Sequence, residues 1–184
     1  QREKGRQSNK QGWWEISPES EGRVFEEKMP AEYLGDGLGR GTGRADALVF
    51  AFSTEEVSGV LRYANENGIP VTPRGAGTNL VGSTIPLFGG IILDVSRMNR
   101  VLELDRDTMT ITVEPGMLPK DLQAYAEERG LFYPPDPGDK ASSIRGNICP
   151  NAGAIRPVKY RVTRDYVRGL AAVLADCTVI HLAD

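Results

Sequence analysis

A strand, a helix and a second strand that runs directly into a glycine-rich loop are the feature that most constrains this fold. Residues 47–52 form a short apolar run between turn residues, which is typical of a buried strand. Ser53 and Glu56 have the spacing of a capping box, and apolar positions then recur at helical spacing up to Gly68. Residues 69–72 are then predicted to form the second strand. Such a β-α-β unit implies a right-handed crossover and a parallel pair of strands.

The remainder of the domain predicts further strands, one more helix and several loops. Met109, Ile111 and Val113 alternate with threonines, so we expect these three side chains to fill one buried face of a strand. The other predicted elements are a buried strand at 90–95, a hairpin of 101–104 with 109–113, a helix from Pro119 to Gly130, an extended proline loop at 133–137, a glycine-containing loop at 142–158 and a last hairpin of 170–174 with 178–182.

The chain divides into an N-terminal arm and one domain. Residues 1–44 are polar and rich in glycine, so we expect them to wrap over the domain without a core of their own. Trp13 and Trp14 are expected to anchor the arm by packing, and stacking on a ligand is the alternative. Residues 45–184 form the domain.

Charge and composition exclude several classes of function. The formal net charge is −3 and no block of basic residues is present, which argues against a nucleic-acid partner. The apolar runs fall far short of the roughly 18 residues of a membrane span, and we expect a cytoplasmic protein without a signal peptide. Cys149 and Cys177 lie too far apart for a metal knuckle, and His181 is the only histidine, so we expect no metal site.

The loop at residues 73–83 has the composition that a pyrophosphate site requires. Glycines leave backbone N–H groups exposed and allow positive φ angles, which together form a nest for an anion. A Walker A loop is excluded because Ser83 stands where the phosphate-binding lysine would be. The dinucleotide fingerprint also fails, because Leu80 stands at its third glycine. A tight surface loop without a ligand remains the alternative.

A second group of small and amide-bearing residues follows the proline loop. Asn147 and Asn151 can both donate and accept hydrogen bonds, as the edge of a heterocycle such as a flavin ring requires. Ordinary turn chemistry is the alternative explanation for these residues.

Five motifs occur in this order along the chain: PRGAGTNLVGS at 73–83, VEPG at 113–116, YPPDP at 133–137, IRGN to NAGA at 144–154 and VKYRVTRDYVRGL at 158–170. Together they resemble the FAD-linked oxidases of the vanillyl-alcohol oxidase or PCMH type, and most of all their D-lactate dehydrogenase and glycolate oxidase D-subunit branch. The resemblance covers roughly residues 45–184 and implies an α+β fold, incomplete at its C-terminus. A small parallel β-α-β subdomain and an antiparallel subdomain would hold FAD between them.

The resemblance also implies which residues contact the cofactor. The glycine-rich loop would receive the pyrophosphate, the proline loop would flank the flavin, the second loop would follow the ribityl chain and the ring, and one valine would lie near the adenosine. No catalytic residue is assigned. The cofactor residues are Arg74, Gly75, Ala76, Gly77, Thr78, Leu80, Pro135, Asp136, Gly146, Asn147, Asn151, Gly153 and Val167.

The activity that the resemblance implies is hydride transfer from the CH–OH group of a 2-hydroxy acid to FAD. The FAD would be bound non-covalently, because the first loop has no histidine. In the family a cap domain supplies most substrate contacts, so we expect the chain alone to be inactive and to meet substrate only with a cap domain or partner chain. Two alternatives are a degenerate module that has lost tight FAD binding, and another reaction of the family on aryl alcohols, sugar lactones or nucleotide sugars.

Several residues stand where this branch has glycine or another small residue. If such a residue adopts a left-handed conformation, it costs about 1 to 2 kcal/mol. The sequence therefore predicts strain at these positions, which are Asn79, Ser83, Arg145, Ala154, Arg161 and Cys177.

Overall fold

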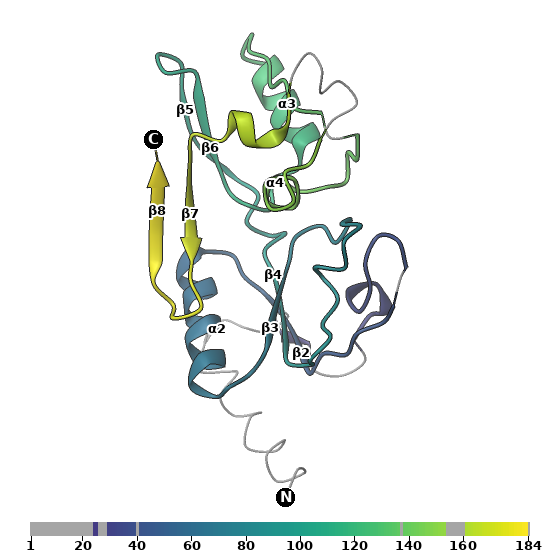
Figure 1. The fold of residues 1–184 in the computed structure, drawn as a ribbon. Coiled ribbons are helices and arrows are strands. Elements are labelled where there is room, and N and C mark those ends of the chain that lie inside the picture. Colours follow the sequence, from purple (N-terminus) through teal and green to yellow (C-terminus); the bar gives the residue numbers. More distant parts are fainter. Residues whose placement is uncertain (1–23, 26–28, 40, 137, 154–160, 184) are drawn as a thin grey trace, which may run out of the picture.

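The chain folds into two lobes joined by extended segments (Figure 1). The structure is a computed structural model that describes residues 24–25, 29–39, 41–136, 138–153 and 161–183. One lobe holds a mainly parallel sheet and helix α2 (Thr54–Glu66), and the other holds the hairpin of β5 (Val101–Asp105) and β6 (Thr110–Val113) with two helices. Parallel and antiparallel sheets in one chain confirm the expected α+β class. Trp13, Trp14 and Ala154 lie outside the described residues.

Strand β4 (Ile91–Asp94) is the centre of the first lobe. It pairs in parallel with β2 (Ala47–Phe50) on one side and with β3 (Val71–Arg74) on the other. The two strands of the predicted β-α-β unit are therefore parallel, but β4 lies between them. All four β4 side chains are buried, and an apolar strand of this kind is favoured where both neighbours cover it. No sequence pattern predicted strand β1 (Val24–Phe25), which pairs antiparallel with β2.

Helix α2 begins and ends as predicted. The Ser53 hydroxyl accepts a hydrogen bond from the Glu56 amide at 3.3 Å, which caps the first turn. The Glu56 carboxylate returns to the amide of Phe52, at 2.8 Å, and so reaches one residue earlier than in a capping box. Gly68 follows the helix with φ +61°, the conformation expected of a terminating glycine. Buried Val60 and Ala64 then hold the helix against the sheet.

The second lobe has its own small core, formed where the β5–β6 hairpin packs near α3 (Pro119–Glu127). Ile111 and Val113 pack against this core, as predicted. Met109 does not, because it lies in the turn with φ +55° and its side chain is 68% exposed. The prediction that Met109 is buried is therefore wrong, since the strand begins one residue later.

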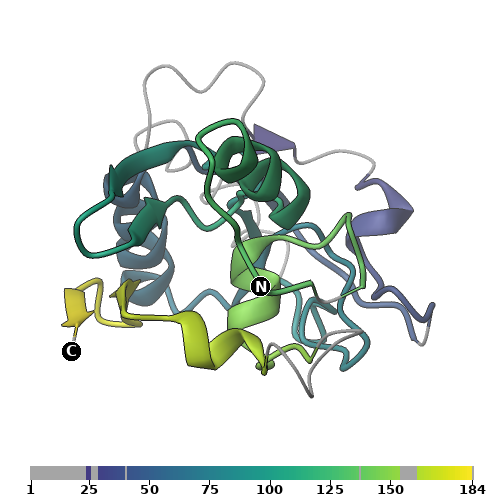
Figure 2. The same cartoon turned by 90° about the horizontal axis from the view of Figure 1, so that it is seen from above.

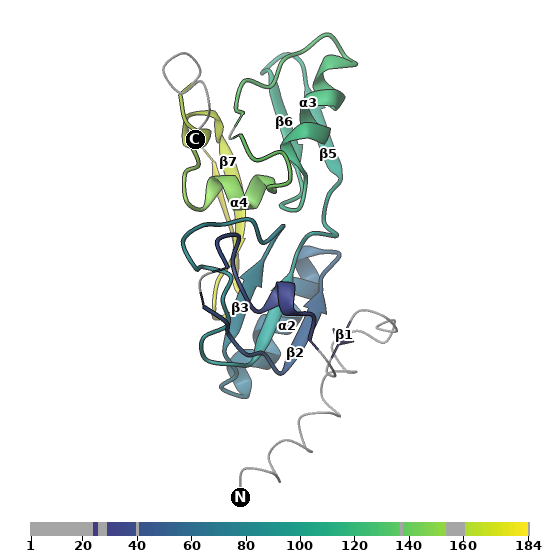
Figure 3. The same cartoon turned by 90° about the vertical axis from the view of Figure 1, so that its right-hand side faces the viewer.

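A short helix, α4 (Ile144–Ile148), lies within the region predicted to be a loop. The Ser143 hydroxyl caps it by accepting from the Gly146 amide at 3.2 Å. Five residues are too few for a helical apolar pattern to be read from sequence. Figure 3 shows α4 at the level where the two lobes meet, next to the end of the parallel sheet.

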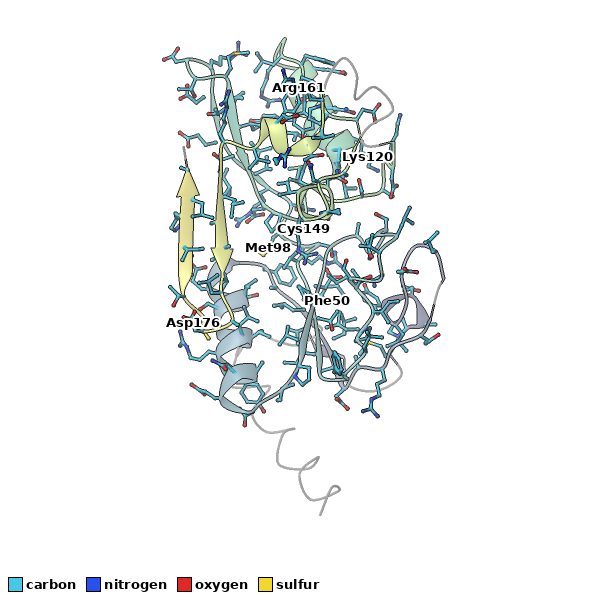
Figure 4. All side chains as sticks on the ribbon, in the orientation of Figure 1. Phe50, Met98, Lys120, Cys149, Arg161 and Asp176 are labelled. Atoms are coloured by element: carbon cyan, nitrogen blue, oxygen red, sulfur yellow. The ribbon has the colours of Figure 1, made fainter. Side chains whose placement is uncertain are left out.

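The last hairpin joins β7 (Gly169–Val173) to β8 (Val179–Ala183), as predicted, and reaches back along the first lobe. The turn between the two strands contacts α2, where the Ser58 hydroxyl donates to the carbonyl of Cys177 at 3.0 Å. Figure 4 shows Asp176 at this end of the hairpin, beside the helix. The view from above in Figure 2 shows the hairpin at the margin of the molecule.

Only some of the residues that replace family glycines adopt left-handed backbone. Arg161 has φ +60° and Cys177 has φ +70°. Within the described residues, Asn79, Ser83 and Arg145 do not have positive φ angles. The predicted strain is therefore confirmed at the first two positions and wrong at the other three. Arg145 is free of it because it lies in the first turn of α4.

Replacing Cys177 with glycine should therefore stabilise the chain, whereas Arg145→Gly should destabilise it. C177G removes a left-handed side chain and should raise the free energy of unfolding by about 1 kcal/mol. R145G loosens a helical turn and should lower it by about 0.5 to 1 kcal/mol. Urea unfolding of both variants measures this difference. Equal effects of the same sign would show that backbone conformation does not decide the outcome.

Glu114 ties the turn after β6 to the segment that precedes β5. The carboxylate is 6% exposed and accepts from the Arg100 amide at 2.8 Å and from its guanidinium at 2.7 Å. The hydrogen bonds from Arg100 outweigh burial and lower the pKa of Glu114 from its usual 4.5. The carboxylate therefore stabilises the fold above pH 4.5, and this contribution is lost as pH falls through the lowered pKa.

Glu114→Gln should reduce stability at neutral pH but have less effect in acid. We expect a loss of about 1 kcal/mol at neutral pH, because one side of the ion pair is exposed and screened. The difference in free energy of unfolding between the two proteins should shrink as pH falls below about 4.5. Denaturant unfolding over a pH series measures it, and a difference that does not change with pH would refute the assignment.

Candidate functional site

The glycine-rich loop begins where β3 ends, at the carboxyl edge of the parallel sheet. Ligands of open parallel sheets bind outside this edge. Gly77 has φ +75°, a conformation that suits glycine. Within the described part of the chain, no hydrogen bond has the backbone amide of Ala76, Gly77 or Thr78 as its donor. Three adjacent N–H groups are therefore available to an anion, as the pyrophosphate of FAD requires.

The two loops that sequence analysis selected lie against each other. A Cβ atom placed on Gly75 would collide with the Ser143 hydroxyl, and Gly75 is buried. Ser143 is 1% exposed and begins the turn of α4. The glycine-rich loop of one lobe thus meets the α4 segment of the other at one close contact. This contact places Gly146 and Asn147 near the same edge of the sheet.

Arg74 supports the glycine-rich loop from inside. The side chain is 7% exposed, and its guanidinium donates to the carbonyls of Glu32 at 2.8 Å and of Gly35 at 3.3 Å. A Cβ atom on Gly77 would collide with this guanidinium. Burial lowers the pKa of Arg74, and the nearby Asp94, Tyr33 and Glu32 act in the opposite direction. The guanidinium is held by main-chain carbonyls and lies beneath Gly77.

Asn147 presents an unused carboxamide at the second loop. The residue is 4% exposed. Its backbone amide donates to the Ser143 carbonyl at 3.0 Å, and its backbone carbonyl accepts from the Ala152 amide at 2.8 Å. Its side chain makes no hydrogen bond within the described residues. Within the described residues, no buried side-chain nitrogen or oxygen lacks a partner, so the Asn147 carboxamide reaches the surface, where it is open to a ligand that both donates and accepts.

Asn151 and Val167 connect the second loop to the 3-10 turn η2 (Thr163–Tyr166). Asn151 has φ +53°, and its side-chain oxygen accepts from the Arg164 amide at 3.0 Å. The amide of Val167 donates to the Arg164 carbonyl at 3.2 Å. One oxygen of Asn151 is therefore occupied within the chain, unlike the carboxamide of Asn147. Gly153 is exposed, and a Cβ atom placed on it would make only ordinary contact with Val162.

The proline loop follows α3. The carbonyl of Pro135 accepts from the Gln123 side chain at 3.2 Å, and Pro135 is buried. The Asp136 carboxylate accepts from the Gly138 amide at 3.3 Å. Burial raises the pKa of the neighbouring Tyr133 to about 12, and the nearby Tyr166 adds to this rise. The loop is thus fixed to its own lobe.

Apolar side chains are exposed after the glycine-rich loop. Leu80 is 59% exposed, so this predicted cofactor neighbour makes little contact within the chain itself. Val81, Leu87 and Phe88 are 70%, 68% and 80% exposed. These exposed apolar residues lie within or shortly after the glycine-rich loop in the sequence.

Two residues at the site were missed by sequence analysis. Asp94 ends β4, is 2% exposed and accepts from the Ser96 amide at 2.7 Å. Burial raises its pKa, while Ser96 and the two arginines nearby lower it. Tyr33 lies under Arg74, whose guanidinium carbon is 4.8 Å from the ring centre. A carboxylate at the end of an otherwise apolar strand was the available signal for Asp94.

Neither a metal-binding cluster nor a membrane-spanning helix is found in the described part of the chain. There, no group of three or more His, Cys, Asp or Glu side chains could hold a metal ion. None of the helices that the structure describes is both long and apolar enough to cross a membrane. Cys149 is exposed, and Figure 4 shows it where the two lobes meet.

The chain belongs to the FAD binding domain family, whose sequence profile matches residues 45–183. It is 45% identical over 142 residues to a D-lactate dehydrogenase of Anaerostipes hadrus, which covers 77% of this chain and 30% of that protein. It is 47% identical over 137 residues to glycolate oxidase subunit GlcD of Bacillus subtilis (strain 168), covering 74% and 29%. The fold matches p-cresol methylhydroxylase with a TM-score of 0.76 at 22% identity, over 96% of this chain and 35% of that one.

These comparisons confirm the resemblance, the PCMH-type fold and FAD as the cofactor of the family. The chain spans about 30% of the length of the curated relatives. The contacts of the individual cofactor residues stay predictions.

The contact between the lobes can be tested with Gly75→Ala and Ser143→Ala. G75A should destabilise the chain by about 1 to 3 kcal/mol, because the new methyl group collides with the Ser143 hydroxyl. S143A removes that hydroxyl and should cost about 1 kcal/mol as a lost helix cap. The double variant should be more stable than the sum of the two losses predicts, since only the Ser143 Cβ at 3.5 Å then faces the new methyl group. Additive losses in urea unfolding would show that the two residues do not touch.

Proposed function

We propose that this chain is the FAD-binding portion of an oxidoreductase that acts on a 2-hydroxy acid of the D-lactate or glycolate type. The observation that carries the proposal is the row of three free amides at Ala76, Gly77 and Thr78, with the unused carboxamide of Asn147 on the adjoining loop. The amides are suited to an anion and the carboxamide to the edge of a ring. FAD carries both groups, a pyrophosphate and a flavin ring. The relatives named above support the substrate class.

The residues of this chain have distinct parts in the proposal. The free amides bind the pyrophosphate, and Asn147 with Gly146 lies along the ribityl chain and ring. Asn151, Gly153, Pro135 and Asp136 hold the shape of the surrounding loops. When bound, FAD supplies the hydride acceptor for the carbon that carries the substrate hydroxyl.

The FAD is held non-covalently in this proposal. His181 is the only histidine of the sequence, and it is exposed on β8, whereas the glycine-rich loop lies at the end of β3. Substrate contacts and the catalytic acid or base come from a cap domain or a partner chain. The chain alone is therefore expected to bind FAD but not to turn over a 2-hydroxy acid.

FAD titration of Gly77→Ala against the unchanged chain tests the proposal. The unchanged chain should quench flavin fluorescence saturably, with a dissociation constant of about 1 μM or lower. G77A forces a side chain into φ +75° and into the Arg74 guanidinium, so it should weaken binding by about tenfold or more.

Gly68→Ala is the matched control. Gly68 also has a positive φ, +61°, but no atom lies within 4 Å of the added methyl group and the residue follows α2. G68A should lose stability and retain FAD affinity. A cooperatively folded chain that binds no FAD would overturn the oxidoreductase proposal and favour the degenerate module, which the strained Arg161 and Cys177 would then help to explain.

A further inference from the structure

The segment that precedes the family-matched region lies directly against the glycine-rich loop. The amide of Gly37 donates to the carbonyl of Asn79 at 2.9 Å. The carbonyl of Gly35 accepts from the Thr84 hydroxyl at 3.4 Å as well as from Arg74. The family profile begins at residue 45, so the family match does not include these contacts.

Packing between the two segments is as close as the hydrogen bonding. A Cβ atom on Gly37 would lie 2.9 Å from the Thr78 carbonyl oxygen and 3.2 Å from that of Asn79. The first distance is shorter than real Cβ atoms show, the second is shorter than most of them show, and both involve backbone. Gly37 is not one of the described glycines with a positive φ. A methyl group at this position would therefore act through the collision alone.

Arg74 carries the effect of the segment to the loop. Its guanidinium donates to the carbonyls of Glu32 and Gly35, and it stacks on Tyr33. The ring of Tyr33 also meets that of Phe50 edge-on, with centres 6.2 Å apart, which fixes the segment to β2. A buried guanidinium that lost these carbonyls would have to move, and Gly77 rests on it.

We propose that residues 31–37, acting through Arg74, hold the glycine-rich loop in the conformation that binds the pyrophosphate of FAD. Arg74 is a positioning residue in this arrangement. The proposal rests on the FAD-binding function proposed above, and it adds to the cofactor site a segment that lies before the family-matched region.

The test compares Gly37→Ala and Arg74→Lys with the unchanged 184-residue chain. Both the dissociation constant for FAD and the urea unfolding midpoint without FAD are measured. G37A should lower the midpoint, because its methyl group collides with backbone, but should leave the chain folded without urea and weaken its FAD binding by about tenfold or more. R74K keeps the charge but cannot reach two carbonyls as a planar fork does, and it should weaken binding to a similar extent.

The double variant separates positioning from direct binding. If Arg74 acts through the segment, G37A combined with R74K should weaken binding little more than R74K alone. Multiplied losses would show that Arg74 contacts FAD independently and would overturn the positioning role. Gly39→Ala is the control, because its φ is +64° but nothing lies within 4 Å of the added methyl group, and it should retain FAD affinity.

The outcomes also distinguish this proposal from the function on which it rests. An unchanged chain that binds no FAD refutes the function itself. An unchanged chain that binds FAD, with R74K and G37A binding equally well, refutes the positioning segment alone. If G37A unfolds, R74K decides the matter by the same two measurements.

Discussion

Burial of β4 on both faces is the constraint on which the rest of the structure depends. Its four side chains fill the centre of the first lobe, which forces β2 and β3 to lie on either side in parallel. In this register Phe50, Asp94 and Arg74 end their strands side by side. The carboxyl edge of the sheet therefore carries an aromatic ring, a carboxylate and a guanidinium in one row. The glycine-rich loop begins from the last of them.

That row explains why a charged residue can be buried at the site. Arg74 is beside Asp94 and over Tyr33, and two main-chain carbonyls take its hydrogen bonds. A buried charge is tolerated only with such partners. The buried Arg74 guanidinium in turn gives Gly77 a fixed support. Within the described residues, the amides of Ala76, Gly77 and Thr78 donate to no group of the chain.

Local patterns were sufficient to predict most elements, including α2, the two hairpins and α3. Capping residues, turn glycines and alternation are encoded by neighbours in the sequence, and these held at Ser53 and Gly68. The position of β4 between β2 and β3 was not predictable in this way, because it depends on which strand can be covered on both faces. Helix α4 was too short to show a period.

The candidate site was predicted in its loops but not in its supports. Glycine spacing identified residues 75–77, and amide chemistry identified Asn147, because both requirements act over a few residues. Tyr33 and Asp94 reach Arg74 only through the fold, from segments far apart in the sequence. Asn151 illustrates the opposite case: the residue type was right for a ligand, yet its oxygen is bonded to the Arg164 amide.

The strained Arg161 and Cys177 lie away from the glycine-rich loop. Figure 4 shows Arg161 in the second lobe, and Cys177 lies in the turn against α2. Among residues 75–80, all of them described, only Gly77 has a positive φ, and glycine adopts that conformation without strain. Replacing family glycines by Arg161 and Cys177 therefore lowers the stability of the fold without placing a strained residue among Ala76, Gly77 and Thr78. A ligand stabilises the state that binds it. FAD bound across the contact between Gly75 and Ser143 would therefore hold the two lobes together and offset part of the lost free energy of unfolding.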